Sequence, residues 1–422
     1  MKYPNRFLLL AGILLVATTL RAPFTIIAPL LEDIQSSYGL SATQVGLLIT
    51  GPLLAFSAIA PFAAGLAGRW GTERTLFGAL MIIAVGVLFR ASGGAAPLYV
   101  GTVIIGSGIA LGNVLLPSLL KRDFHDKVAP LTAMYVLTMG IAAAGGSALV
   151  IPLSTALHAD WHLVSRLPLL LVVLAALVWL PQLRRPHVPA VHKLASGEAP
   201  VSMLRSPLAW QVTAYLGLDC FLYYVGVSWL PAILRDTAGY SAAQAASLHG
   251  VLLLSTALPG LVLIPLAPKL RDQRAVAAVL ALIMSVGLLG FVLAPMHAVL
   301  WIVFFGIGAG GGLILALALI SLRTSNAVEA AALSGMAQCI GYFFAAAGPP
   351  LIGKANEIAG SWQAPLSLCA ALGVVMAVIG TYAGRNLHVG RPVAAASSPS
   401  RLDGDGGNFQ QGVLGQTGNL HG

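Results

Sequence analysis

Apolar runs of about 15 to 25 residues alternate with short polar segments over most of the chain. At a rise of ~1.5 Å per residue, a helix of about 20 such residues crosses a bilayer core of roughly 30 Å. The pattern predicts an all-α polytopic membrane protein with twelve transmembrane helices, over residues 7–31, 43–66, 75–89, 97–120, 129–152, 163–181, 207–230, 243–267, 275–294, 298–320, 331–352 and 364–382.

A polar segment rich in Pro, His and Arg separates the first six runs from the last six. We therefore expect a six-helix bundle over residues 1–181, a cytoplasmic linker over 182–206 and a second six-helix bundle over 207–384. Residues 385–422 are rich in Gly, Ser, Pro and Asn and have no apolar period, which predicts a disordered cytoplasmic tail.

The two halves repeat each other at a spacing of 200 to 201 positions. Gly39–Gln44 reads GLSATQ and Gly239–Gln244 reads GYSAAQ. Both contain the S-x-x-Q pattern of a helix capping box. An even number of spans in each half makes the repeats parallel. Other pairs at this spacing are Gly106 and Gly306, Gly108 and Gly308, Gly112 and Gly312, Arg122 and Arg323, and Trp161 and Trp362.

Composition agrees with the membrane class, since 58% of the residues are hydrophobic and only 9% are charged. Most of the 23 lysine and arginine residues fall in segments on one side of the membrane, together with both termini. Basic residues favour the cytoplasmic side, so both termini are expected there. This asymmetry explains the net charge of +9 without a nucleic-acid partner.

The motifs of other protein classes are weak or missing. The three cysteines lie in apolar runs without zinc or disulfide spacing. Gly306-x-Gly308-x-x-Gly311 matches a dinucleotide fingerprint only formally, because it lies inside an apolar run with no preceding strand. We expect no enzyme activity, no cofactor and no metal.

One arginine, Arg21, lies well inside the first apolar run. A guanidinium near the centre of a membrane helix costs about 2.5 to 3.5 kcal/mol, so Arg21 should face a water-filled cavity and meet an anion. Two alternatives are that Arg21 extends to the membrane surface, or that residues 2–20 form a signal peptide.

Asp219 is the matching acidic residue in the seventh run, and Gln211, Tyr215 and Tyr223 recur at steps of four on the same helix. Because the first and seventh runs are counterparts in the repeat, Arg21 and Asp219 should lie at similar depth in one central cavity. Asn113 and Gln338 are further polar candidates; packing between helices is the alternative for both amides and for the two tyrosines. Arg90 and Arg166 lie near helix ends, where extension to the lipid headgroups is expected.

Three stretches carry a family resemblance: Leu20–Pro23, Gly112–Phe124 and Trp210–Leu234. They resemble the cyanate transporter and 2-nitroimidazole exporter branch of the major facilitator superfamily. The resemblance implies a small anion or a small polar heterocycle as substrate. The chain departs from the superfamily's Asp-Arg-x-Gly loop signature, where it has Gly68-Arg69-Trp70-Gly71, and Asp219 stands where the branch more often has an amide.

The sequence therefore predicts a secondary active transporter of the inner membrane that moves a small anion, such as cyanate or a small carboxylate, by alternating access. Asp219 would couple transport to protons. The expected partners are an anionic small molecule and the lipid bilayer, with the chain acting as a monomer. Alternatives are efflux of drug-like heterocycles of the nitroimidazole type, or a membrane receptor without flux. The expected substrate-binding residues are Arg21, Asn113, Tyr215, Tyr223 and Gln338.

Overall fold

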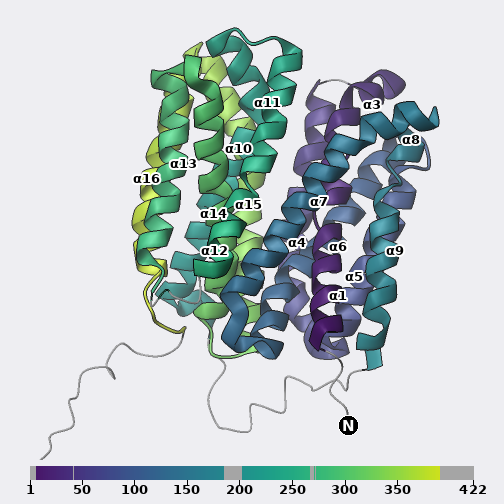
Figure 1. The fold of residues 1–422 in the computed structure, drawn as a ribbon, viewed down its shortest axis with the longest axis vertical. Helices are drawn as coiled ribbons and strands as arrows, with labels where there is room; N and C mark the ends of the chain where they lie inside the picture. The colour runs from purple at the N-terminus through teal and green to yellow at the C-terminus, as the bar shows by residue number, and fades with distance from the viewer. Residues whose placement is uncertain (1–5, 41, 185–201, 267–269, 271, 390–422) are drawn as a thin grey trace, which may run out of the picture. The chain divides into compact units, whose positions relative to one another are not determined.

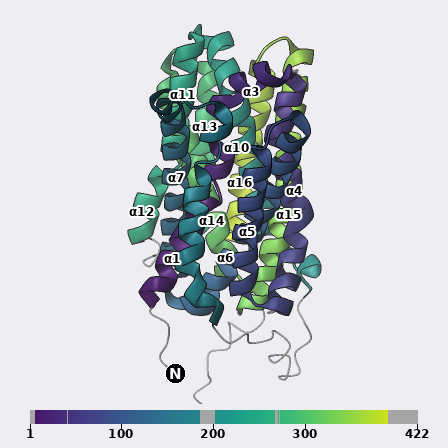
Figure 2. The same cartoon turned by 90° about the vertical axis from the view of Figure 1, so that its right-hand side faces the viewer.

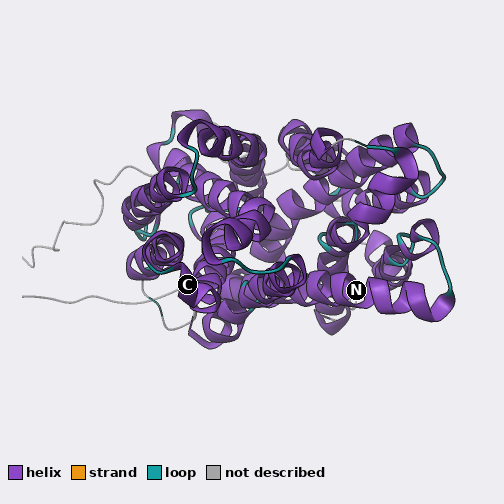
Figure 3. Cartoon of the chain, turned by 90° about the horizontal axis from the view of Figure 1, so that it is seen from above, coloured by secondary structure: helices purple, strands orange, loops and turns teal. Residues whose placement is uncertain are grey.

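A computed structural model of the chain describes residues 6–40, 42–184, 202–266, 270 and 272–389. Within these ranges the chain consists of helices and short connections (Figure 3). Eleven helical segments of the described chain are long and apolar enough to cross a membrane. The fold is thus the expected all-α membrane fold.

The first half supplies the purple to blue helices of Figure 1 and the second half supplies the teal to yellow ones. The expected linker lies mostly outside the described residues, and so does the expected tail from residue 390 onward.

The side of the membrane at which α1 begins is called the N side. The helices of the first half are α1 (Arg6–Thr19), α2 (Ala22–Thr25), α3 (Leu31–Tyr38), α4 (Ala42–Trp70), α5 (Thr72–Arg90), α6 (Ala95–Asp123), α7 (Val128–Leu157), α8 (Trp161–Val164) and α9 (Pro168–Trp179). Those of the second half are α10 (Pro207–Ala238), α11 (Ala242–Ser255), α12 (Leu258–Leu266), α13 (Arg274–Leu293), α14 (Ala298–Leu322), α15 (Ala327–Ala359) and α16 (Gln363–Ala383).

The first span is not the continuous helix that residues 7–31 predict. Helix α1 ends at Thr19, and a separate turn, α2, begins at Ala22. Pro23 explains the break, because its ring has no N–H to donate and clashes with the carbonyl four residues earlier. Arg21 therefore occupies a non-helical position between the two pieces, with φ −127° and ψ −41°.

The eighth span is also interrupted. Helix α11 ends at Ser255 and α12 begins at Leu258, just before Pro259. Helix α12 packs against α7 of the other half, and the two lie near each other in Figure 2. A Cβ atom added to Gly260 would lie 2.9 Å from the Leu137 side chain, so the two backbones approach closely here.

Side-chain contacts repeat between the halves as the sequence spacing predicts. The indole N–H of Trp161 donates to Ser37 Oγ at 3.1 Å, and that of Trp362 donates to Asp236 Oδ2 at 2.9 Å. Both members of the Gly108 and Gly308 pair allow close helix approach, because a Cβ there would meet backbone atoms of α5 or α13.

The helix caps and the arginine contacts on the N side can also be compared between the two halves. The predicted capping box at Ser241 and Gln244 is present, with both hydrogen bonds made. Its first-half counterpart begins at Ser41, which is outside the described residues. On the N side, Arg122 pairs with Glu73, and Arg323 donates to Gln273 at the equivalent place.

Candidate functional site

A narrow cavity of about 20 Å³ lies between the two halves. Its wall comes from the break after α1, from α7, and from α10, α14 and α15, with Thr256 from the break between α11 and α12. Both interrupted spans thus contribute to it. The lining residues are Arg21, Val136, Gly140, Asp219, Cys220, Tyr223, Tyr224, Thr256, Ala309, Gly310, Leu313 and Tyr342.

Arg21 brings a positive charge into this cavity. Its guanidinium carbon lies 5.3 Å from the centre of the Tyr223 ring, which is cation–π contact distance. Within the described residues its side chain makes no hydrogen bond. The guanidinium therefore faces the space between the halves, and its N–H donors are available to a ligand.

Asp219 brings a carboxyl group into the same cavity from α10. The residue is 1% exposed, and its Oδ1 atom has no hydrogen-bond partner among the described residues. Asp219 interacts electrostatically with Arg21, but the two side chains form no direct ion pair in the described structure. The carboxyl also packs against α14 at Gly312, where an added Cβ would collide with Oδ1.

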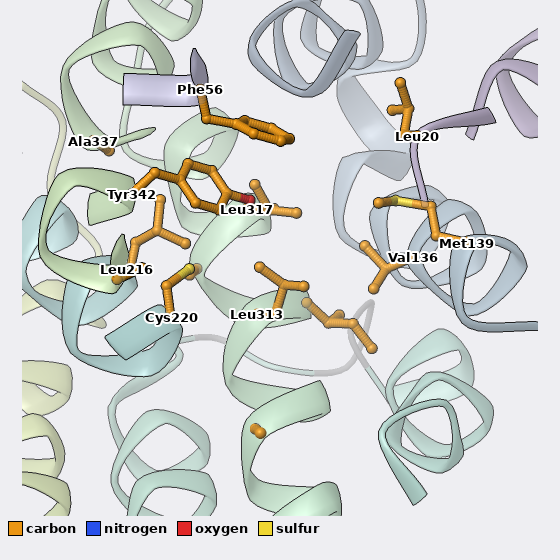
Figure 4. Packing of buried hydrophobic residues seen from close by; sticks show 14 of the residues in the cluster. Leu20, Phe56, Val136, Met139, Leu216, Cys220, Leu313, Leu317, Ala337 and Tyr342 are labelled. Carbon is orange, nitrogen blue, oxygen red and sulfur yellow. The ribbon is translucent and has the colours of Figure 1, made fainter. Parts of the chain in front are cut away.

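Aromatic rings form much of the remaining wall. The rings of Tyr223 and Tyr224 lie 5.1 Å apart, edge to face, and Tyr224 lies 6.5 Å from Tyr342. Phe56 packs on Tyr342 at 4.4 Å, as Figure 4 shows, with Cys220 and Leu313 nearby. Such rings offer apolar faces on which a flat ligand can stack.

The structure brings three of the six predicted site residues to the cavity, namely Arg21, Asp219 and Tyr223. Tyr215 is turned away, and its hydroxyl donates to the carbonyl of Ala277 at 3.3 Å. Residues at steps of four advance by about 40° beyond a full turn each time, so a stripe of this kind winds around the helix. Tyr215 and Tyr223 consequently face different neighbours.

The two predicted amides are also absent from the cavity wall. Gln338 is 1% exposed; its Nε2 donates to Ser334 Oγ at 2.8 Å, and its Oε1 has no partner among the described residues. It lies one turn from Tyr342 on the same face of α15, toward the N side. Asn113 is buried within α6 and is not among the lining residues.

The sequence reasoning missed Tyr224, Cys220 and Thr256 as lining residues. Tyr224 and Cys220 neighbour predicted residues on α10, and the Pro259 that follows the second break could have indicated Thr256. The expectation for Arg90 was wrong: its side chain is 1% exposed and donates to backbone carbonyls inside the first half. Arg166 is exposed and donates to the carbonyl of Ala91 at 2.9 Å.

Side-chain contacts between the halves include two on the N side of the cavity. Ser321 Oγ donates to the carbonyl of Pro117 at 2.8 Å, near the N-side ends of α14 and α6. Ser57 Oγ lies 4.0 Å from Cys339 Sγ. The halves are thus held together below the cavity, between it and the N side.

The arrangement of two six-helix repeats around a central cavity has a counterpart among known families. Residues 13–346 match the model of the Major Facilitator Superfamily. The chain belongs to this superfamily. The fold is also that of a solved protein, the human organic anion transporter MFSD10, with a TM-score of 0.72 and 16% identity over 90% of this chain and all of that one.

Relatives within the superfamily have more specific names. The chain is 50% identical to the 2-nitroimidazole transporter of Escherichia coli K12 over 389 residues, which cover 91% of this chain and 97% of that protein. It is 28% identical to the cyanate transport protein CynX of the same organism, over 84% of this chain and 91% of that protein. The chain is accordingly a multi-pass membrane transporter and not an enzyme.

Proposed function

We propose that this chain is a secondary active transporter for small flat molecules that carry a nitro group or a negative charge, bound in the cavity between its halves. One observation carries the proposal: the Arg21 guanidinium stands over the Tyr223 ring inside that cavity. A guanidinium presents a planar fork of N–H donors that matches two oxygens of a carboxylate or nitro group. The tyrosine faces beside it suit the rest of a flat ligand.

The wall of the cavity favours a flat ring over a linear triatomic ion. Three tyrosine rings, those of Tyr223, Tyr224 and Tyr342, line it and offer faces on which a flat ligand can stack. The names of the relatives point the same way, since the 2-nitroimidazole transporter is 50% identical and the cyanate transport protein only 28%. A small anion such as cyanate, which the sequence predicts as substrate, is the second candidate. The guanidinium of Arg21 in the cavity could bind such an anion.

Asp219 supplies the proposed coupling to protons. Its carboxyl is buried beside the same cavity without a hydrogen-bond partner for Oδ1, and it interacts with Arg21 across that space. In the proposal, protonation of Asp219 strengthens the pull of Arg21 on an anionic ligand because the competing negative charge is removed. The halves then rock around the loaded cavity. In the proposal both termini lie in the cytoplasm, so the N side is the cytoplasmic face of the inner membrane.

The test is counterflow transport in proteoliposomes with three substrates: 2-nitroimidazole, benzoate and cyanate. Arg21→Gln should abolish benzoate uptake and weaken 2-nitroimidazole uptake at least about tenfold, which corresponds to about 1.4 kcal/mol. Asp219→Asn should leave counterflow intact and remove the pH dependence of uptake. Arg166→Gln is the matched control, because Arg166 is an exposed arginine away from the cavity.

The outcomes separate the candidates. Unchanged transport of all three substrates in Arg21→Gln contradicts the proposal. Retained 2-nitroimidazole transport with loss of benzoate and cyanate transport favours a neutral heterocycle held by the tyrosines. Binding without counterflow in the unmodified protein supports a receptor.

A further inference from the structure

Arg90 is a buried arginine that contacts the broken first span. It ends α5 and is 1% exposed. One terminal nitrogen of its guanidinium donates to the carbonyl of Pro23 at 2.6 Å, and the other lies 3.3 Å from the carbonyl of Ser165. Pro23 is two residues beyond Arg21, so Arg90 contacts the turn that carries the charged residue of the cavity.

The hydrogen bond to Pro23 falls where the backbone needs a donor. Helix α2 ends at Thr25, and a turn at Ile26 and Ile27 follows. The last carbonyls of a helix have no donor within the helix. A buried carbonyl without a donor costs about 1 to 3 kcal/mol, and Arg90 supplies that donor for Pro23.

Burial of the Arg90 guanidinium is itself unfavourable. Among the described residues no carboxylate pairs with Arg90, and its Nε has no hydrogen-bond partner. Buried arginines are ordinarily paired with an acid, since an unpaired buried charge destabilises the fold. A neutral donor would satisfy one carbonyl without burying a charge. The second hydrogen bond, to Ser165, therefore points to a role for the contact that joins the two carbonyls.

The second half provides a comparison inside the same molecule. Its counterpart of the broken span, α10, runs without interruption from Pro207 to Ala238. The position 200 residues after Arg90 is Gly290, against which the Trp301 ring packs. The second half thus has no arginine at the position equivalent to Arg90, and its counterpart of the first span is unbroken.

We propose that Arg90 is a positioning residue for Arg21: by joining Pro23 to Ser165 it fixes the α2 turn and so directs the Arg21 guanidinium into the cavity. A second anchor acts on the same turn, since Thr25 Oγ1 lies 3.2 Å from the carbonyl of Ala143 in α7. The inference rests on the proposed function, in which Arg21 binds substrate.

The test is a double-mutant cycle on ligand binding to the purified full-length protein, with 2-nitroimidazole as the probe. Arg90→Met, which keeps the length and loses the donors, should raise the dissociation constant and the KM of transport about tenfold with a smaller effect on kcat. Arg90→Lys should recover part of the loss. In an Arg21→Gln background, where residual binding relies on the tyrosines, Arg90→Met should change binding by less than about twofold, because coupled residues are non-additive.

Two control variants distinguish a loss of positioning from a general loss of structure. Arg166→Met removes a neighbouring arginine that donates to the carbonyl of Ala91 and does not touch the turn, so its binding should equal that of the unmodified protein. Thr25→Val loosens the same turn without burying a new charge; it should weaken binding in the same direction as Arg90→Met and lose its effect in the Arg21→Gln background.

Equal effects of Arg90→Met in both backgrounds, or no effect of either Arg90→Met or Thr25→Val on binding, would overturn the positioning role. If Arg90→Met does not fold, the Thr25→Val cycle alone decides between these outcomes. The proposed function fails separately, when Arg21→Gln by itself leaves 2-nitroimidazole binding unchanged.

Discussion

Gly312 offers a way to displace the Asp219 carboxyl without changing any charge. A Cβ placed on Gly312 would collide with Asp219 Oδ1 and would lie 3.0 Å from its Cγ and 3.3 Å from Met376 Cε. The end of a methionine can move aside, whereas the Asp219 carboxyl is enclosed at 1% exposure on a neighbouring helix. Gly312→Ala should therefore push the carboxyl from its place.

The expected magnitude follows from two opposing effects. Overpacking of a buried site typically costs about 1 to 3 kcal/mol. Alanine is favoured over glycine inside a helix by up to about 1 kcal/mol, which offsets part of that cost. Gly145, inside α7, is the matched control, since a Cβ there meets nothing within 4 Å. We expect Gly312→Ala to be less stable than Gly145→Ala by about 1 to 3 kcal/mol.

The assay combines thermal unfolding in detergent with uptake into proteoliposomes over a range of pH. Gly312→Ala should lower the melting temperature and change the pH dependence of uptake, because the carboxyl that takes up the proton has moved. Gly145→Ala should alter neither. Two glycine variants with the same stability and the same pH profile would refute the packing of Asp219 against α14.

Three further changes test other parts of the structure. Tyr342→Leu removes a ring from the cavity wall and should weaken binding of 2-nitroimidazole by about 1 kcal/mol while cyanate binding stays unchanged, as measured by titration calorimetry. Ser321→Ala removes the hydrogen bond to Pro117 and should speed hydrogen–deuterium exchange at the N-side ends of α6 and α14; unchanged exchange would show that this bond does not hold the halves. The pKa of Asp160 lies below its ordinary value, chiefly because the carboxylate accepts a hydrogen bond from the Leu163 N–H. The ionised carboxylate therefore stabilises the fold above the unfolded-state pKa. This stabilisation is lost as the pH falls through the lower folded-state pKa. Asp160→Ala should accordingly lower the melting temperature at neutral pH and have no effect in strong acid.

The all-α membrane architecture could be predicted from sequence because length and apolarity alone determine whether a helix can cross a membrane. The repeat was readable for a similar reason, since equivalent packing positions keep the same residues, as at Trp161 and Trp362. The breaks at Pro23 and Pro259 were not predicted. Hydropathy does not fall at a proline in an apolar run, although the helix is interrupted there.

The charged part of the site was predicted more accurately than its polar part. Arg21 and Asp219 line one cavity because an ionisable side chain inside a membrane is stable only where it faces protein or water. Gln338 and Tyr215 are satisfied, in part or in full, by local partners, and only the three-dimensional structure shows those partners. Arg90 was misplaced because the carbonyls that it contacts belong to residues far away in the sequence.

In the proposed mechanism Arg21 and the tyrosines hold the transported molecule between the two halves. The position of a bound iodinated nitroimidazole, found from the anomalous scattering of iodine in crystals of the complex, tests this. The ligand should lie in the cavity, against the Tyr223 ring with its nitro group toward the Arg21 guanidinium. A ligand bound outside this cavity, or an Arg21 side chain turned to the lipid in the complex, would contradict it.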